Sequence, residues 1–147
     1  MSKRDEGRVN FLGFTGHHDP EILLEAMRRF DFDTVLVALN AADVHRLSFI
    51  RTVLPEAQRR GLGVIGMKVY GAGTLIGPGG LAPDQAMRYV LSLPGVSTVV
   101  IGCGTPGEVE QNAQIAREFV PLSPSEMQEL ETSTRKIAGR FTSYKVR

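Results

Sequence analysis

The stretch Thr34-Val35-Leu36-Val37-Ala38-Leu39 is a continuous aliphatic run of strand length. A strand that is apolar on both sides is typical of a parallel sheet with two covered faces. A helix is expected on each side of it. Asp19-Pro20 supplies an N-cap and a proline at the first helical position, and an apolar stripe follows at helical spacing. After the strand, residues 47–60 predict a helix that Pro55 kinks or splits.

The same alternation continues in both directions. Further strands are expected at 9–15, 63–67 and 97–101, and further helices at 83–91, 106–119 and 124–136. Thr105 with Glu108, and Ser123 with Glu126, have the spacing of capping boxes. The tail 141–147 has no assigned element. The order β-α-β-α-β-α-β-α-α predicts an α/β fold of parallel βαβ units. Periodicity leaves two architectures open, an open doubly wound sheet or a four-unit segment of a (β/α)8 barrel.

Composition narrows the class of protein. The 147 residues fit one domain (1–147) and are about half of the ~250 that a full (β/α)8 barrel needs. Lys+Arg 17 against Asp+Glu 16 argues against a nucleic-acid partner. The run 35–39 is too short to span a bilayer, and no apolar segment follows the charged residues 1–8, so the cytoplasm is the expected location. A single cysteine, Cys103, excludes an internal disulfide and a multi-cysteine metal site.

Four motifs then occur in the order and spacing of the aldo-keto reductase superfamily. They are Gly13-Phe14-Thr15-Gly16-His17, Leu39-Asn40, Gly63-Val64-Ile65-Gly66-Met67-Lys68 and Gly102-Cys103-Gly104-Thr105-Pro106-Gly107-Glu108-Val109-Glu110-Gln111-Asn112. They are similar to the fifth to eighth barrel strands of that family and the loops after them. The resemblance covers about 7–131. It implies the C-terminal half of a (β/α)8 TIM barrel, with a further C-terminal helix. It also implies an oxidoreductase that moves a hydride between NADPH or NADH and a carbonyl.

The resemblance also implies where catalysis takes place. The family's catalytic Asp, Tyr, Lys and His lie on the first half of the barrel, which this sequence does not contain. The residues of those types found here do not occupy the corresponding positions: His17, His18, Lys68, Tyr70 and Tyr89. No catalytic residue is therefore assigned. The isolated chain, as a truncated product or one piece of a split enzyme, is expected to be inactive.

Residues that hold the nicotinamide are implied at three strand ends. Thr15 and Gly16 match the pair that meets the carboxamide of the nicotinamide, with Gly16 in place of a usual Asn. Asn40 matches the amide residue that reads the same group. The residue that stacks on the ring falls at Met67 or, with a small shift of register, at Tyr70. A methionine can cover an aromatic face through its polarizable sulfur.

Residues for the phosphates and the adenosine are implied on two loops. Gly71, Ala72 and Gly73 match the pyrophosphate segment, where glycine lets backbone N–H groups approach phosphate oxygens. The second loop lies just before a helix start, and its candidates are Gly102, Cys103, Gly104 and Thr105. Asn112 matches an adenine-contacting Asn, and Gln111 stands where Glu is common. Glu108 stands where many members have the Arg that pairs with a 2′-phosphate, so a preference for NADP over NAD is not indicated.

Simpler interpretations stand beside these. Thr15 and Asn40 can cap loops, Glu108 is already part of a capping box, and 71–80 is a possible flexible loop. The pair His17-His18 is a candidate metal site or, more simply, two polar loop residues, so no metal is assigned. Cys103 is a small buried or loop residue or a reactive thiol.

Three other functions remain open: a non-catalytic NAD(P)-binding or interaction subunit, a folded truncated remnant, and a different phosphate-binding half-barrel. Half a barrel leaves its edge strands 9–15 and 97–101 unpaired, and a net charge of +1 gives little protection against association. The partner is therefore expected to be a second copy, in a homo-oligomer, or a separate N-terminal half-barrel. No membrane partner is expected.

Overall fold

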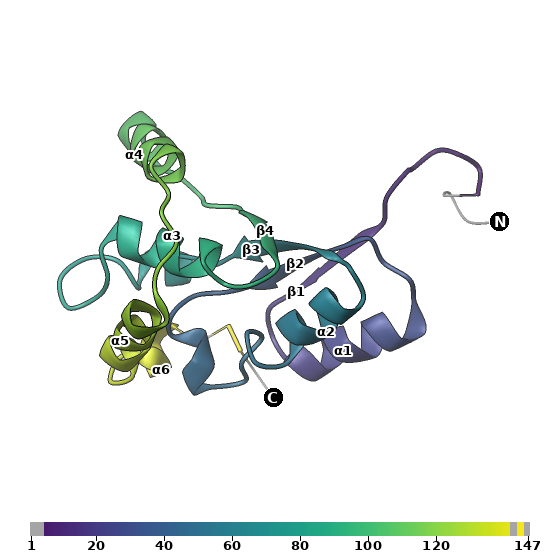
Figure 1. Cartoon of the computed structure of the whole chain (residues 1–147), viewed down its shortest axis with the longest axis horizontal. Helices are drawn as coiled ribbons and strands as arrows, with labels where there is room; N and C mark the ends of the chain where they lie inside the picture. Colours follow the sequence, from purple (N-terminus) through teal and green to yellow (C-terminus); the bar gives the residue numbers. More distant parts are fainter. Residues whose placement is uncertain (1–4, 142–143, 146–147) are drawn as a thin grey trace.

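The strands form one parallel sheet among the residues that the computed structural model describes, 5–141 and 144–145. The strands are β1 (Gly13–Gly16), β2 (Thr34–Ala38), β3 (Gly63–Met67) and β4 (Val96–Val99). They lie in the order β1-β2-β3-β4, each parallel to the next (Figure 1). A barrel segment has this arrangement, with parallel strands that lie in the sheet in the same order as in the sequence.

Each strand is followed by a helix, and a proline marks the start of three of these four helices. The helices are α1 (Pro20–Arg29), α2 (Val53–Arg59), α3 (Pro83–Leu91), α4 (Pro106–Arg117), α5 (Pro124–Thr134) and α6 (Ala138–Phe141), with the 3-10 turns η1 (Asp43–His45) and η2 (Gly71–Gly73). Asp19 accepts from the backbone N–H of Glu21 at 2.9 Å and caps α1. Ser123 and Glu126 form the expected reciprocal capping box of α5.

The helices α1 and α3 cover the same face of the sheet. Gly16 and Gly66 lie in one row across the strands, because Gly16 pairs with Val37 and Val37 with Gly66. Gly16 faces the Leu23 side chain of α1, and a Cβ on Gly66 would lie 2.9 Å from Val90 of α3. A doubly wound sheet carries helices on both faces. The structure therefore selects the half-barrel alternative.

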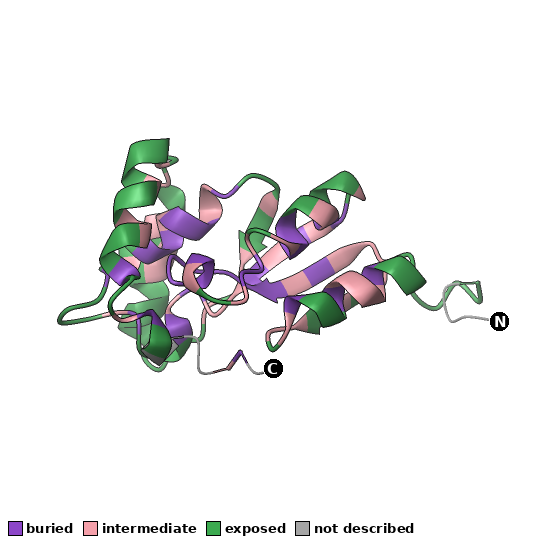
Figure 2. Ribbon diagram, turned by 90° about the horizontal axis from the view of Figure 1, so that it is seen from below, coloured by how far each residue is buried: buried purple, intermediate pink, exposed green. Residues whose placement is uncertain are grey.

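The other face of the sheet is open. Thr15, Leu36, Ile65 and Thr98 form a continuous row across the four strands. Leu36 and Ile65 are only half-buried and the two threonines are exposed, whereas Val35, Val37 and Val64 on the helix side have no exposed surface. Figure 2 shows this alternation along the central strands. The core therefore lies between the sheet and the helices, and the face that lines the inside of a barrel is uncovered.

Two predicted elements differ substantially from the structure, and several others differ by one or two residues at an end. The first strand begins at Gly13 instead of residue 9, because Gly13 pairs with Thr34, the first residue of β2, and earlier residues have no strand opposite them. The helix predicted over 47–60 is confined to Val53–Arg59. Pro55 neither kinks nor splits it, since the first turn of a helix contains N–H groups without intrahelical partners and tolerates proline.

Candidate functional site

The predicted cofactor residues gather at one end of the sheet, the carboxyl ends of the strands. Thr15 and Gly16 are the last residues of β1, Met67 is the last residue of β3, and Asn40 follows β2 by two residues. The other candidates lie on the loops after β3 and β4 and on α4. Barrel enzymes place their sites at this end.

A hollow of about 440 Å³ opens between the ends of β3 and β4. It is lined by Met67, Lys68, Val69, Tyr70, Ala72, Gly73, Val100, Ile101 and Gly102. Five of the predicted residues are therefore brought to one concave surface: Met67, Tyr70, Ala72, Gly73 and Gly102. Its volume lies within the range of small-molecule sites, ≈ 300–1,000 Å³. Lys68 is the one cationic side chain among the residues that line it.

The wall of this hollow is joined to α4 by hydrogen bonds. Tyr70 donates its hydroxyl to Oδ1 of Asn112 at 2.6 Å, and the Asn112 amide lies 3.2 Å from Sγ of Cys103. Burial raises the pKa of Tyr70 to about 12, so its hydroxyl remains a donor at neutral pH. Asn112 is thereby held beside the hollow, while Gln111 is exposed on the same helix.

The glycine-rich loop has the backbone conformation that its sequence suggests. Gly71, Ala72 and Gly73 have φ values of 57°, 59° and 87°, in the left-handed region. The N–H of Gly71 donates to the Lys68 carbonyl at 2.8 Å, and that of Gly73 to the Tyr70 carbonyl at 2.9 Å. These two N–H groups stabilise the loop itself.

The loop after β4 is exposed and carries a carboxylate. Glu108 accepts from the N–H of Gly104 at 2.6 Å, and its own N–H donates to the Thr105 hydroxyl at 3.3 Å. The Glu108 carboxylate thus accepts from the N–H of Gly104, whereas a capping box would have it accept from the N–H of Thr105. Its negative charge lies at the start of α4, the position that would otherwise attract a phosphate.

Asn40 occupies a closed position at the end of β2. It has no exposed surface, and its amide donates to the Lys68 carbonyl and to the Tyr144 hydroxyl, both at 3.0 Å. Its Oδ1 accepts from the N–H of Ala42 at 3.0 Å. Thr15, at the end of β1, is exposed and donates its hydroxyl to the Leu36 carbonyl at 3.0 Å.

A buried ion pair holds Lys145 at this end of the sheet. Nζ of Lys145 contacts Oδ1 of Asp43 and donates to the Arg46 carbonyl at 2.8 Å. Both side chains of the pair are fully buried. Oδ2 of Asp43 also accepts from the Ser48 hydroxyl at 2.7 Å and from the N–H of Ile50 at 2.9 Å. Burial raises the pKa of Asp43 and lowers that of Lys145, and the two charges oppose these shifts.

His17 and His18 lie beside this cluster. Their ring centroids are 4.5 Å apart, and the His17 ring meets the Tyr144 ring edge-on at 5.8 Å. Burial, together with the His18 and Lys68 charges, lowers the pKa of His17. Within the described part of the chain, no three His, Cys, Asp or Glu side chains gather closely enough to hold a metal ion. Cys103 is exposed and lies on the loop after β4.

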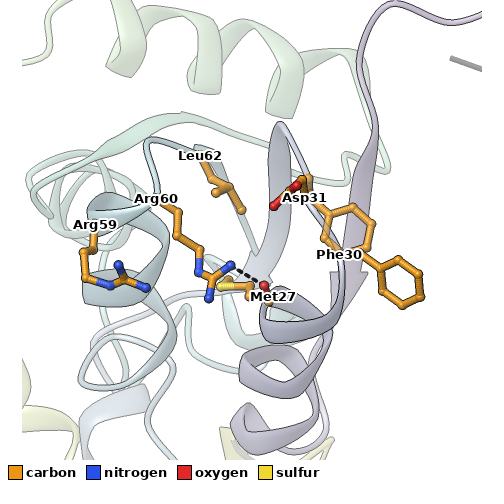
Figure 3. A pocket seen from close by; sticks show the side chains of 7 residues that line it. Met27, Phe30, Asp31, Arg59, Arg60 and Leu62 are labelled. Carbon is orange, nitrogen blue, oxygen red and sulfur yellow. Dashed lines mark hydrogen bonds between the residues drawn. The ribbon is translucent and has the colours of Figure 1, made fainter. Parts of the chain in front are cut away.

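A second hollow, of about 420 Å³, lies at the opposite end of the sheet (Figure 3). Its lining comes from the end of α1, the end of α2 and the residues just before β2 and β3. Arg59 and Arg60 in its wall both pair with Glu56, and Arg60 also donates to the Met27 carbonyl. None of the predicted site residues lines it, so we assign it no ligand.

Three residues for which no site role was predicted also lie at this end of the sheet. Lys68 directly follows β3, a correctly predicted strand, so its position at the carboxyl end of the sheet could have been predicted from the sequence. Tyr144 and Lys145 lie about 100 residues from their partners Asn40 and Asp43, and no local pattern marks such a contact.

Comparisons with known proteins agree with this architecture. No family model and no curated protein sequence matches the chain. Among solved structures, it is similar to the holo and apo forms of the aldo-keto reductase AKR11C1 from Bacillus halodurans, each at 18% identity over 89% of this chain, with TM-scores of 0.70 and 0.71. It is likewise similar to the thermostable aldo-keto reductase Tm1743 in complex with the inhibitor epalrestat, at 18% identity, 89% coverage and a TM-score of 0.67.

The alignment covers only 51–53% of those structures, so the chain spans about half their length. At this level of identity the likeness establishes the fold. The chain therefore has an α/β fold that matches half of an aldo-keto reductase (β/α)8 barrel, as the sequence motifs predicted. No helix among its described residues combines the length and apolar character needed to cross a membrane.

Proposed function

We propose that this chain is the nucleotide-binding half of an aldo-keto reductase-type oxidoreductase that reduces carbonyls to alcohols. The observation that carries this proposal is the hollow between β3 and β4, which gathers Met67, Tyr70 and the loop 71–73 around Lys68. A polarizable side chain, an aromatic ring and a cation on one concave surface suit a flat heterocycle joined to a diphosphate. NADH or NADPH has this chemistry and would supply the hydride.

The residues of the hollow fit such a ligand in part. Met67 and Tyr70 would contact the nicotinamide, and Lys68 and the N–H of Ala72 would contact the phosphates. Gly102 leaves space beside them, since nothing lies within 4 Å of a Cβ placed on it. The carboxylate of Glu108 opposes a second phosphate on the ribose, so we expect NADH to bind at least as well as NADPH.

A companion half-barrel would complete the enzyme. The exposed large apolar side chains of the described residues lie toward the two edges of the sheet. Those near β1 and α1 are Val9, Phe11, Ile22 and Phe30, and those after β4 are Val100, Val109 and Val120. Apolar surface at both edges, next to unpaired strands and an open inner face, is what four further strands and their helices would cover. The companion would also carry the proton donor, because none is assigned on this chain.

Nucleotide binding and carbonyl reduction together test this proposal. The chain alone is expected to bind NADH weakly and to reduce aldehydes no faster than background, since a missing general acid typically costs 10²–10⁴-fold in rate. Co-expression with a companion N-terminal half-barrel is expected to restore NADH-dependent reduction.

The matched variants are Lys68→Met, which removes the cation of the hollow, and Lys136→Met, which makes the same change at an exposed position. Only the first is expected to weaken binding. No binding of either nucleotide at millimolar concentration would refute the proposal. Turnover by the purified chain that a mutation in this chain abolishes would show that the catalytic groups lie here.

A further inference from the structure

The helix α1, which follows the edge strand β1, carries an uncovered apolar stripe. Ile22, Ala26 and Phe30 recur every four residues and therefore lie on one side of the helix. Ile22 is 63% exposed and Phe30 is 64% exposed. The three residues line an open hollow of about 610 Å³ along α1. Leu23 and Met27 of the same helix are buried, so the stripe is left uncovered after α1 has packed on the sheet.

The helix α4, which follows the other edge strand, β4, carries a second stripe. Val109, Ala113 and Ala116 have the spacing i, i+4, i+7 of one helix face. Val109 is 55% exposed, and no residue of α4 is buried. The contact of α4 with its neighbour α3 uses a different side, since Ile115 lines one hollow together with side chains of α3. The stripe therefore lies on a flank that the described part of the chain does not cover.

Each uncovered helix flank adjoins an edge of the sheet. The strands β1 and β4 are the two ends of the strand order, and each is four residues long. The helices α1 and α4 lie on opposite sides of the molecule (Figure 1). In a complete (β/α)8 barrel every strand is paired on both sides and the helices form a closed outer ring. The chain thus has two unlike flanks, β1 with α1 and β4 with α4, and each has the surface that the other would meet in a closed ring.

A second copy of the chain supplies both missing flanks at once. A two-fold axis along the barrel places β1 of each copy beside β4 of the other, with all strands parallel. Two sets of four strands give eight, the number at which a barrel closes around an interior that side chains fill. Closed two-fold pairs are the commonest oligomers, and a net charge of +1 gives little repulsion between copies.

The two stripes also match in size. Ile22 is the third residue of α1 and Val109 the fourth residue of α4, so they lie at the same end of two parallel helices. Packed helices lie about 8–10 Å apart. Ala26 on one helix, and Ala113 with Ala116 on the other, leave room for such a close approach.

We propose that this chain forms a two-fold dimer in which β1 of one copy pairs with β4 of the other and the α1 stripe packs on the α4 stripe. The inference goes beyond the proposed function and does not depend on nucleotide binding. In the enzyme, the companion half-barrel takes the place of the second copy.

Crosslinking tests which helices meet. Cys103→Ser removes the one native cysteine, and Ala26→Cys and Ala113→Cys are added to that background singly and together. Each full-length variant is treated at micromolar concentration with a short bis-maleimide crosslinker. We expect the doubly substituted chain to give a covalent dimer on a denaturing gel, because α1 of one copy lies beside α4 of the other. Each singly substituted chain is expected to remain monomeric on the gel.

Three results would overturn the inference. A covalent dimer from a singly substituted chain would show that the copies meet through the same helix. A ladder of larger species from the doubly substituted chain would show that the contacts do not close. Monomer from all three variants would show that the stripes do not meet. Failure of the parent chain to bind NADH would overturn the proposed function and leave this inference standing.

Sedimentation equilibrium tests the stripe by itself. Ile22→Glu introduces a charge that occurs twice in the dimer, and it is expected to raise the dissociation constant of the dimer by about tenfold or more. The matched control is Ser133→Glu, which adds the same charge at an exposed position of α5 and is expected to leave the dimer unchanged. Equal dissociation constants for the two variants would contradict the proposed interface.

Discussion

Replacing Lys145 by methionine tests how strongly its ion pair with Asp43 stabilises the fold. The change keeps most of the side-chain volume but leaves the buried Asp43 carboxylate without its cation. Breaking a buried pair in this way costs about 3–5 kcal/mol. For a chain of 147 residues, 1 kcal/mol corresponds to roughly 3 °C in the unfolding midpoint. We therefore expect the midpoint of Lys145→Met to fall by about 10 °C or more.

The loss depends on pH in a defined direction. Burial raises the pKa of Asp43 and Lys145 opposes that shift, so removing Lys145 raises the pKa further above its unfolded value. The folded variant then binds more protons than the unfolded chain. The penalty is fully present above the folded pKa and is lost as the pH falls through it. The difference in unfolding midpoint between Lys145→Met and the parent is therefore expected to become smaller from pH 8 toward pH 5.

Thermal unfolding followed by circular dichroism measures both effects. Lys136→Met is the matched control, since it makes the same change at an exposed lysine. Its midpoint is expected to stay within about 1–2 °C of the parent, as for most surface changes. If Lys145→Met and Lys136→Met unfold at the same temperature, Lys145 is not anchored by Asp43.

Three further predictions concern helix packing, the charge at Glu108 and the unpaired edges of the sheet. Gly66→Ala places a Cβ 2.9 Å from Val90, so calorimetry is expected to show a free energy of unfolding lower by about 1–3 kcal/mol. Gly107→Ala is the control, because nothing lies within 4 Å of its Cβ, and it is expected to be neutral or stabilising. Glu108→Arg is expected to raise the ratio of NADPH to NADH affinity about tenfold in a fluorescence titration, because a cation replaces a carboxylate. Sedimentation at micromolar concentration is expected to show association through the uncovered edges; a monomer with a cooperative transition would contradict the half-barrel argument.

The strands and helices followed from local signals in the sequence. Gly63–Met67 and Pro83–Leu91 have the predicted bounds, because a glycine or proline marks at least one end of each. The start of β1 was wrong, since the length of a strand depends on the strand beside it. The choice between a barrel segment and a doubly wound sheet needed the structure, because it depends on which face Leu23 and Val90 cover.

The sequence predicted the position of candidate site residues that lie at or just after the end of a strand, such as Met67 and Tyr70. It did not predict the hydrogen bond of Asn40 to Tyr144, because the two residues lie 104 positions apart in the sequence. The hydrogen bond of Glu108 to Gly104 was likewise unexpected, since the capping-box spacing predicts the N–H of Thr105 as its partner. Contacts of this kind depend on tertiary packing.

The most direct test of the central claim is a titration of the ¹⁵N-labelled chain with NADH, read at each backbone amide. The two hollows lie at opposite ends of the sheet, so one serves as the control for the other. We predict saturable shifts at residues 67–73 and 101–105, and none at Asp31 or Leu62 beside the second hollow. Shifts confined to Asp31 and Leu62, or none at millimolar NADH, would contradict the account.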